Sequence, residues 1–170
     1  MNNSQNNVFS DVLEANKKFK KSFTYKALTG QAAKGLAIVT CMDSRIDPLA
    51  VVGMESGDVK ILRNAGARVT EDVLRTLVLA SYLLKVNRIL VMPHTDCAMA
   101  SSEEPEIHAK IFEQHQVDTR SLEFRTVSNL KQALITDVTR IRSFPLLSKN
   151  VTVAGAIYNV ETGELELIED

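Results

Sequence analysis

The chain has 170 residues, 45% of them hydrophobic, so it can bury one core, and we expect a single domain over residues 1–170. Lysine plus arginine number 20 against 21 for aspartate plus glutamate, which gives neither the basic surplus typical of nucleic-acid binding nor the acidic excess of a disordered tail. No apolar run approaches the roughly 20 residues that span a bilayer, and residues 1–7 form no apolar signal core, so we expect a cytoplasmic protein. The expected partners are a small-molecule substrate and other copies of the chain, with no nucleic acid and no membrane.

The first half of the chain alternates between helix-like and strand-like segments. Residues 8–23 carry apolar side chains at roughly helical spacing among lysines, which predicts an amphipathic helix. Residues 70–85 have Thr70 as an N-cap, acidic residues in the first turn and an apolar stripe, which predicts a second helix. Short apolar runs with β-branched residues are typical of strands buried on both faces of a parallel sheet, and they occupy residues 36–40, 59–62 and 88–92.

The second half continues the same alternation. Residues 101–119 are polar, with a helix expected at about 106–115, and residues 127–142 resemble another amphipathic helix. A C-terminal hairpin is expected from strands at 151–158 and 165–168, which a Thr-Gly turn separates. Strands separated by helices predict an α/β fold with a mainly parallel central sheet, right-handed crossovers and helices on both faces.

Reactive side chains follow two of the expected strands at the point where each strand ends. Residues 36–45 read LAIVTCMDSR, so Cys41, Asp43 and Arg45 come directly after the first strand, and residues 88–97 read RILVMPHTDC, so His94 and Cys97 come directly after the third. Sites in open α/β sheets assemble outside the carboxyl ends of strands. Two neighbouring strands can therefore bring these five side chains together.

Two thiolates and one imidazole suit zinc, and three protein ligands with an open fourth position are typical of a catalytic zinc site. Asp43 and Arg45 lie two residues apart, so in an extended segment they point the same way and can pair beside the metal. Three alternatives remain open at this stage. Each cysteine taken alone can be a small core residue, the Asp43–Arg45 pair can be an ordinary surface ion pair, and the cysteines can have a redox or structural role without metal.

Together these residues resemble the signature of the β-carbonic anhydrases, which is Cys-x-Asp-x-Arg after one strand and His-x-x-Cys after a later one. Residues 41–45 and 94–97 match both halves in order and spacing, residues 63–67 resemble the family's Arg-Asn-Ala-Gly segment, and residues 155–165 resemble its closing hairpin. The resemblance implies a Zn²⁺ cofactor held by Cys41, His94 and Cys97. It also implies reversible hydration of carbon dioxide to bicarbonate and a proton.

The resemblance assigns further roles. It implies that Asp43 accepts a hydrogen bond at the reacting centre, or becomes a fourth zinc ligand in a closed state, and that Arg45 holds Asp43 and keeps it ionised. It also implies a homodimer, or a higher homo-oligomer, in which the helix expected at residues 8–23 packs on the partner subunit.

The sequence departs from the family pattern on both sides of the second motif. Pro93 precedes His94 and Ala98 follows Cys97, where the family most often carries glycine. Ala98 is therefore a candidate substrate-binding position at which an added methyl group changes activity or substrate. Two alternative functions follow: hydrolysis of carbonyl sulfide or carbon disulfide on the same scaffold, and a catalytically silent zinc-binding protein.

Overall fold

The computed structural model describes residues 8–169, and within them the centre of the molecule is a five-stranded sheet in the order β2-β1-β3-β4-β5. The first four strands run parallel and β5 runs antiparallel to β4. The strands are β1 (Leu36–Cys41), β2 (Val59–Asn64), β3 (Arg88–Met92), β4 (Thr152–Tyr158) and β5 (Leu165–Ile168). The predicted mainly parallel α/β fold with a C-terminal hairpin is confirmed.

The strand order places a reversal beside β1. The chain passes from β1 to β2 on one side and later returns to β3 on the other side of β1, so the two crossovers diverge there. A crevice at the carboxyl ends of the strands is expected at such a reversal. β1 is buried along its whole length, as expected of a central parallel strand.

The helices differ from the predicted ones mainly at their ends. They are α2 (Ser10–Lys21), α3 (Pro48–Val51), α4 (Glu71–Leu83), α5 (Glu104–His115) and α6 (Leu130–Arg142), with short 3₁₀ turns η1 (Tyr25–Ala27), η2 (Ala65–Ala67) and η3 (Ala98–Ala100). Thr70 caps α4 as predicted, because its hydroxyl accepts from the Val73 amide. The short helix α3 was not predicted, although Asp47 caps it and Pro48 begins it, both of which favour a helix start.

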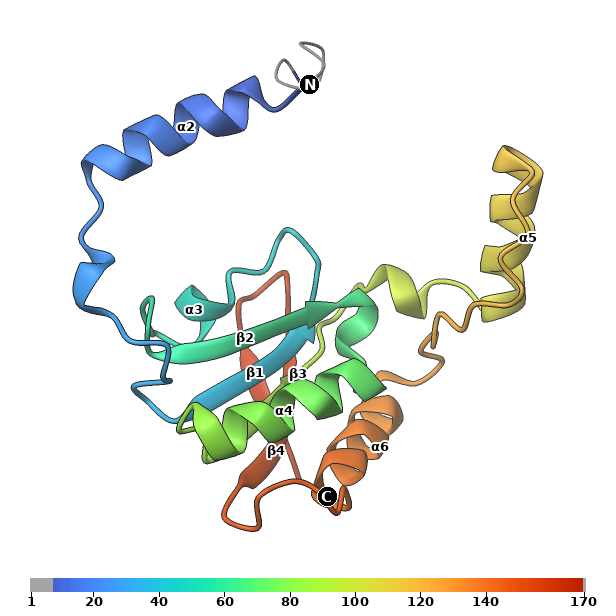
Figure 1. Cartoon of the computed structure of the whole chain (residues 1–170). Coiled ribbons are helices and arrows are strands. Elements are labelled where there is room, and N and C mark those ends of the chain that lie inside the picture. Colours follow the sequence, from blue (N-terminus) through green and yellow to red (C-terminus); the bar gives the residue numbers. More distant parts are fainter. Residues whose placement is uncertain (1–7, 170) are drawn as a thin grey trace.

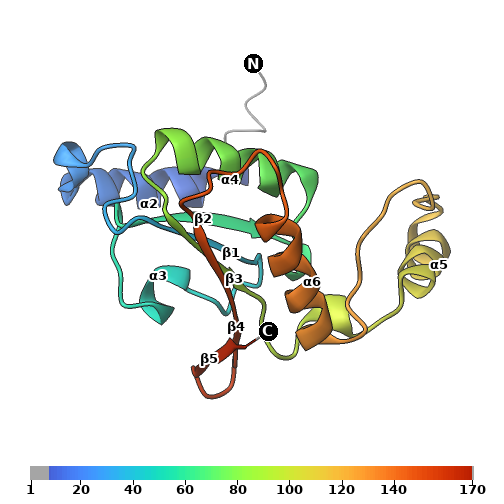
Figure 2. The same ribbon diagram turned by 90° about the horizontal axis from the view of Figure 1, so that it is seen from below.

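The two faces of the sheet are covered unequally. α4 and α6 pack on one face, where Leu77, Leu134 and Ile141 belong to one buried cluster with β1, β3 and β4 (Figure 1). Figure 2 shows the sheet between α4 and the much shorter α3, near which Leu36, Ile38 and Met92 form a second, smaller cluster. This second cluster includes both cysteines, so the candidate site lies next to the less covered face of the sheet.

α2 and α5 stand away from this core. Figure 1 shows both helices projecting beyond the sheet, and neither contains a buried residue. α2 is amphipathic as predicted, yet nothing else in residues 8–169 covers its apolar face: Phe9, just before the helix, and Phe19 within it are 61% and 50% exposed. Among residues 8–169, no helix combines the length and hydropathy needed to cross a membrane.

Candidate metal centre

The site begins where β1 and β3 end side by side. The two strands are paired in parallel up to Thr40 and Met92, so the residues that follow them emerge at the same edge of the sheet. Cys41 is the last residue of β1. The segment after β3 is held against β4, because the Tyr158 amide donates to Pro93 and the Thr95 amide donates back to the Tyr158 carbonyl. This pairing fixes His94 beyond the end of its strand.

The structure brings Cys41, His94 and Cys97 together. One side-chain nitrogen or sulfur atom from each residue lies within 4.8 Å of the others, and the two sulfur atoms are 3.9 Å apart. Both cysteines are free thiols, so this separation is a non-bonded contact and not a disulfide. Zinc bonds of about 2.3 Å to sulfur and about 2.1 Å to nitrogen place tetrahedral ligand atoms at similar separations, so the cluster has the size of a zinc site.

The hydrogen bonding of His94 provides a direct test of whether a metal fits. The ring is 1% exposed, and its Nδ1 lies 2.7 Å from the Thr95 carbonyl oxygen, which can only accept, so Nδ1 carries the proton. Nε2 is then a bare acceptor, and it has no hydrogen-bond partner among residues 8–169. A buried polar atom without a partner costs about 1–3 kcal/mol. A cation between the thiols and the ring would satisfy this nitrogen.

The charges of the cluster also fit a cation. Burial raises the pKa of the Cys97 thiol, and the neighbouring Cys41 sulfur and Asp43 carboxylate raise it further. The Cys97 thiol therefore resists losing its proton unless a positive charge compensates it. A divalent metal supplies that charge and stabilises coordinated thiolates.

Asp43 and Arg45 form a hydrogen-bonded ion pair beside the Cys41–His94–Cys97 cluster. The Arg45 Nη2 and Nε atoms donate to Asp43 Oδ2 at 2.7 Å and Oδ1 at 3.0 Å, and the Arg45 amide donates to Oδ1 at 2.9 Å. These hydrogen bonds hold the pKa of Asp43 well below its usual range. Asp43 Oδ2 also lies 3.8 Å from the bare Nε2 of His94, so the carboxylate is close to the Cys41–His94–Cys97 cluster.

Two further residues join this arrangement, and sequence reasoning gave neither of them a role. Asp96 accepts from Arg45 through its carboxylate at 2.7 Å and its carbonyl at 2.9 Å, with its backbone at φ +52°. Arg63, at the end of β2, donates to backbone carbonyls of the segment that carries Cys41 and Asp43. Both residues lie within the matched motifs, but only the structure shows that Asp96 binds Arg45 and that Arg63 binds the backbone after β1.

Ala98 and Pro93 lie next to Cys97 and His94 in the chain without backbone strain. Ala98 begins η3 and is exposed, and neither residue has the positive φ that favours glycine. A left-handed glycine does occur nearby, since Gly66 has φ +76° and a Cβ there would lie 3.2 Å from the Met99 side chain. The close approach of η2 to η3 therefore depends on Gly66 and not on the position of Ala98.

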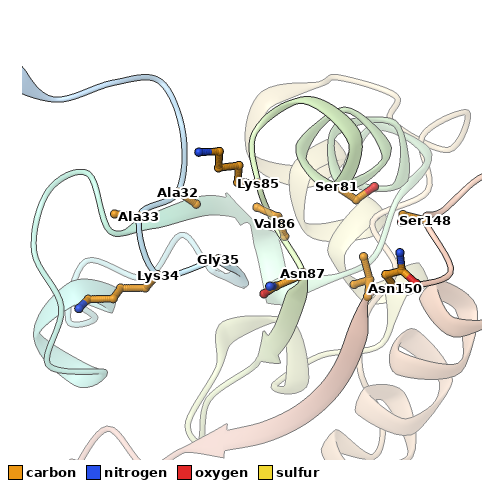
Figure 3. Close-up of a pocket in the computed structure, with 11 residues that line it drawn as sticks. Ala32, Ala33, Lys34, Gly35, Ser81, Lys85, Val86, Asn87, Ser148 and Asn150 are labelled. Carbon is orange, nitrogen blue, oxygen red and sulfur yellow. The ribbon is translucent and has the colours of Figure 1, made fainter.

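A large cavity lies at the opposite end of the sheet and is separate from this cluster. It has a volume of about 590 Å³ and is lined by residues that precede β1, β3 and β4, among them Gly35, Asn87 and Val151. Figure 3 shows that the Lys34 and Lys85 ammonium groups lie far apart and do not converge on a common point. We therefore place the functional site at the carboxyl ends of the strands.

Comparison with known proteins finds relatives over most of this chain. A sequence model of the carbonic anhydrase family matches residues 36–165. Beta-carbonic anhydrase 1 of Mycobacterium tuberculosis is 33% identical over 136 residues, covering 78% of this chain and 81% of its own length. The crystal structure of carbonic anhydrase from Streptococcus mutans superposes with a TM-score of 0.89 at 32% identity, covering 95% of this chain and 97% of its own. Carbon disulfide hydrolase of Saccharolobus solfataricus is 27% identical and covers 93% of this chain and 89% of its own. The chain belongs to the β-carbonic anhydrase family.

Proposed function

We propose that this enzyme uses zinc to catalyse the reversible hydration of carbon dioxide to bicarbonate and a proton. The observation that carries the proposal is the buried cluster of Cys41, His94 and Cys97, in which His94 Nε2 has no partner among residues 8–169. These three side chains would hold the ion. Zinc, when bound, supplies the Lewis acidity that makes water a nucleophile near neutral pH.

In this proposal, the residues around the cluster orient the reacting water and bind the substrate. Asp43 accepts a hydrogen bond from the reacting water, and Arg45 fixes the carboxylate by donating hydrogen bonds to both of its oxygens. The same hydrogen bonds hold Asp43 toward Arg45, and in a closed state Asp43 would join Cys41, His94 and Cys97 as a fourth ligand if Oδ2, which lies 3.8 Å from His94 Nε2, turned away from Arg45. Ala98 is exposed beside Cys97, which supports its proposed role as a substrate-binding position.

Self-association belongs to the same proposal. Nothing in the described part of the chain covers the apolar face of α2, and Phe19, Phe23 and Tyr25 continue this face as a cluster of ring contacts with centroids 5.6 to 6.4 Å apart. Exposed apolar surface of this kind is typical of an interface. It supports a homodimer or larger homo-oligomer in which α2 lies against a partner subunit. We place the protein in the cytoplasm, where reducing conditions keep Cys41 and Cys97 as thiols.

A second candidate function is hydrolysis of carbon disulfide or carbonyl sulfide. The observation that favours it is the carbon disulfide hydrolase relative, which aligns over most of both chains. The same ligand set can act on another linear triatomic molecule, so the shape of the entrance near Ala98 decides between substrates. Discrimination therefore has to be measured on both substrates.

The test compares the substrates on one zinc-loaded preparation. Carbon dioxide hydration is followed by stopped flow with a pH indicator, and sulfide release is followed with carbon disulfide and with carbonyl sulfide. We expect a kcat/KM for carbon dioxide that exceeds that for either sulfur compound by at least about 100-fold. The reverse order would assign the chain to the second candidate. Stoichiometric zinc without any turnover would mean a catalytically silent zinc protein.

A further inference from the structure

Arg63 makes an unusual set of contacts with one short segment. Its Nε donates to the Cys41 carbonyl at 2.9 Å, its Nη2 to the Asp43 carbonyl at 2.6 Å and its Nη1 to the Ile46 carbonyl at 3.2 Å. All of the hydrogen bonds that its side chain makes within residues 8–169 thus end on the backbone of residues 41–46. A guanidinium has five N–H donors in a rigid plane, so one side chain can hold three carbonyls in a fixed relation.

The segment that Arg63 holds is the one that has to be placed accurately. It carries the proposed zinc ligand Cys41 at its start and the Asp43–Arg45 ion pair in its middle. Its other backbone hydrogen bonds are few, since the Met42 amide donates to Asn64 and the Ile46 amide donates to Asp43. The strand holds Cys41 through β-sheet pairing, but beyond Met42 no sheet pairing remains. Besides the contacts of Arg45 with Asp43 and Asp96, Arg63 therefore supplies the restraint on the backbone that carries Asp43.

We propose that Arg63 is a positioning residue, which sets the conformation of residues 42–46 and through it the direction of the Asp43 carboxylate. Within residues 8–169, its guanidinium donates hydrogen bonds to the backbone carbonyls of Cys41, Asp43 and Ile46. The proposal rests on the proposed hydratase function for its kinetic consequence, but not for its structural one. A misplacement of about 1 Å near reacting atoms can lower turnover on the order of 100-fold, so a residue outside the ligand set can control the rate.

Arg88 offers a matched control at the other end of the sheet. It is the first residue of β3, it is exposed as Arg63 is, and its guanidinium also donates to a backbone carbonyl, that of Lys34, at 3.0 and 3.3 Å. An Arg88→Met variant therefore loses a comparable strand-borne arginine and leaves residues 41–46 untouched. Arg63→Lys is the conservative partner, because one ammonium cannot reach three separated carbonyls in the same geometry.

The experiment compares Arg63→Met, Arg63→Lys and Arg88→Met with the parent chain. Zinc content, kcat and KM for carbon dioxide, and amide hydrogen exchange of the peptide covering residues 42–46 are measured for each. For Arg63→Met we expect unchanged zinc content, a kcat lower on the order of 10- to 100-fold, a KM within about threefold, and faster exchange confined to that peptide. Arg63→Lys should fall between Arg63→Met and the parent, and Arg88→Met should match the parent.

Two results would overturn the proposal. One is an Arg63→Met variant whose loop exchange and kcat equal those of the parent. The other is a variant that loses zinc and exchanges faster throughout the chain, because Arg63 would then be a general structural residue. If the parent itself hydrates no carbon dioxide, the proposed function fails, while the exchange comparison still decides whether Arg63 holds the loop.

Discussion

The bare Nε2 of His94 and the two thiols beside it lead to a prediction for Cys97. In a Cys97→Ser variant the hydroxyl stays protonated where the thiolate would bind metal, so we expect zinc affinity to fall on the order of 100-fold or more. Competition with a chromophoric chelator measures this affinity. Ser101→Ala is the control, because its hydroxyl donates to the Ala98 carbonyl in the adjoining turn without facing the cluster. Equal zinc affinity in Cys97→Ser and the parent would remove Cys97 from the ligand set.

Asp96 supports Arg45 from the side opposite to Asp43, which leads to a second prediction. The Asp96 side chain is 76% exposed, and an exposed ion pair contributes about 0.2–1 kcal/mol, so Asp96→Asn should lower turnover by no more than about fivefold. Asp72→Asn removes an equally exposed pair with Arg75 on α4 and should leave turnover unchanged. Steady-state kinetics of the two variants test this. A loss near 100-fold for Asp96→Asn would show that Asp96 does more than support Arg45.

The residues of the site were predictable to different degrees. Cys41, His94 and Cys97 could be found because each follows a strand, and strand ends of a parallel sheet meet at one edge. The Asp43–Arg45 pair followed from its spacing of two residues. Arg45 meets Asp96 across 51 positions and Arg63 meets Asp43 across 20, and both contacts depend on loop conformations that no periodicity in the sequence encodes.

The packing of α6 against β4 depends on a glycine. A Cβ at Gly155 would lie 2.9 Å from two atoms of the Leu134 side chain, so the strand and the helix approach too closely for a larger residue. We expect Gly155→Ala to lower the free energy of unfolding by about 1–3 kcal/mol through overpacking. Gly30→Ala, where no atom lies within 4 Å, should change it little. Denaturant unfolding at equal protein concentration compares them, and equal midpoints would mean that Leu134 moves aside at no cost.

The start of α4 is tied to α6 and to the segment before it by Glu71. Its own backbone amide, and after it the Arg140 guanidinium, lower the pKa of this carboxylate, and Arg125 pairs with it as well. A lowered folded-state pKa stabilises the fold above the unfolded pKa of about 4.3 and ceases to do so as pH falls through the folded value. Glu71→Gln should therefore be less stable than the parent at pH 7, with the difference shrinking in acid.

Unfolding midpoints at pH 7, 5 and 3.5 measure this dependence. Glu113→Gln on α5 is the control, since Glu113 is exposed and forms no ion pair with any residue in 8–169. A difference between Glu71→Gln and the parent that stays constant down to pH 3.5 would contradict the explanation.

The sequence predicted which helices and strands exist better than it predicted where they end and what they pack against. The helices and strands with strong periodicity were found, and the ends moved by a few residues because capping competes with periodicity, as at Asn129, which caps α6 at Leu130. The arrangement of α2 and α5 could not be predicted. Both are amphipathic, and amphipathicity indicates that a face will be covered without saying by what.

The exposed apolar face of α2 leads to a prediction about the oligomeric state of the protein. If a second copy covers it, Phe9→Glu combined with Phe19→Glu should shift the molecular mass in solution toward that of one chain, because each buried aromatic contributes about 2 kcal/mol or more to an interface. Leu146→Glu alters an exposed apolar residue outside α2 and should not change the mass. Sedimentation velocity measures all three proteins. A parent chain that is already monomeric would contradict the association.

The most direct test of the account is the zinc dependence of carbon dioxide hydration. The metal is removed with a chelator, zinc is returned in steps, and the stopped-flow hydration rate is plotted against zinc bound per chain. The account predicts a rate that is lost with the metal, rises linearly with bound zinc and stops rising at one ion per Cys41–His94–Cys97 cluster. A rate that does not depend on zinc, or a fully loaded protein that hydrates no carbon dioxide, would contradict it.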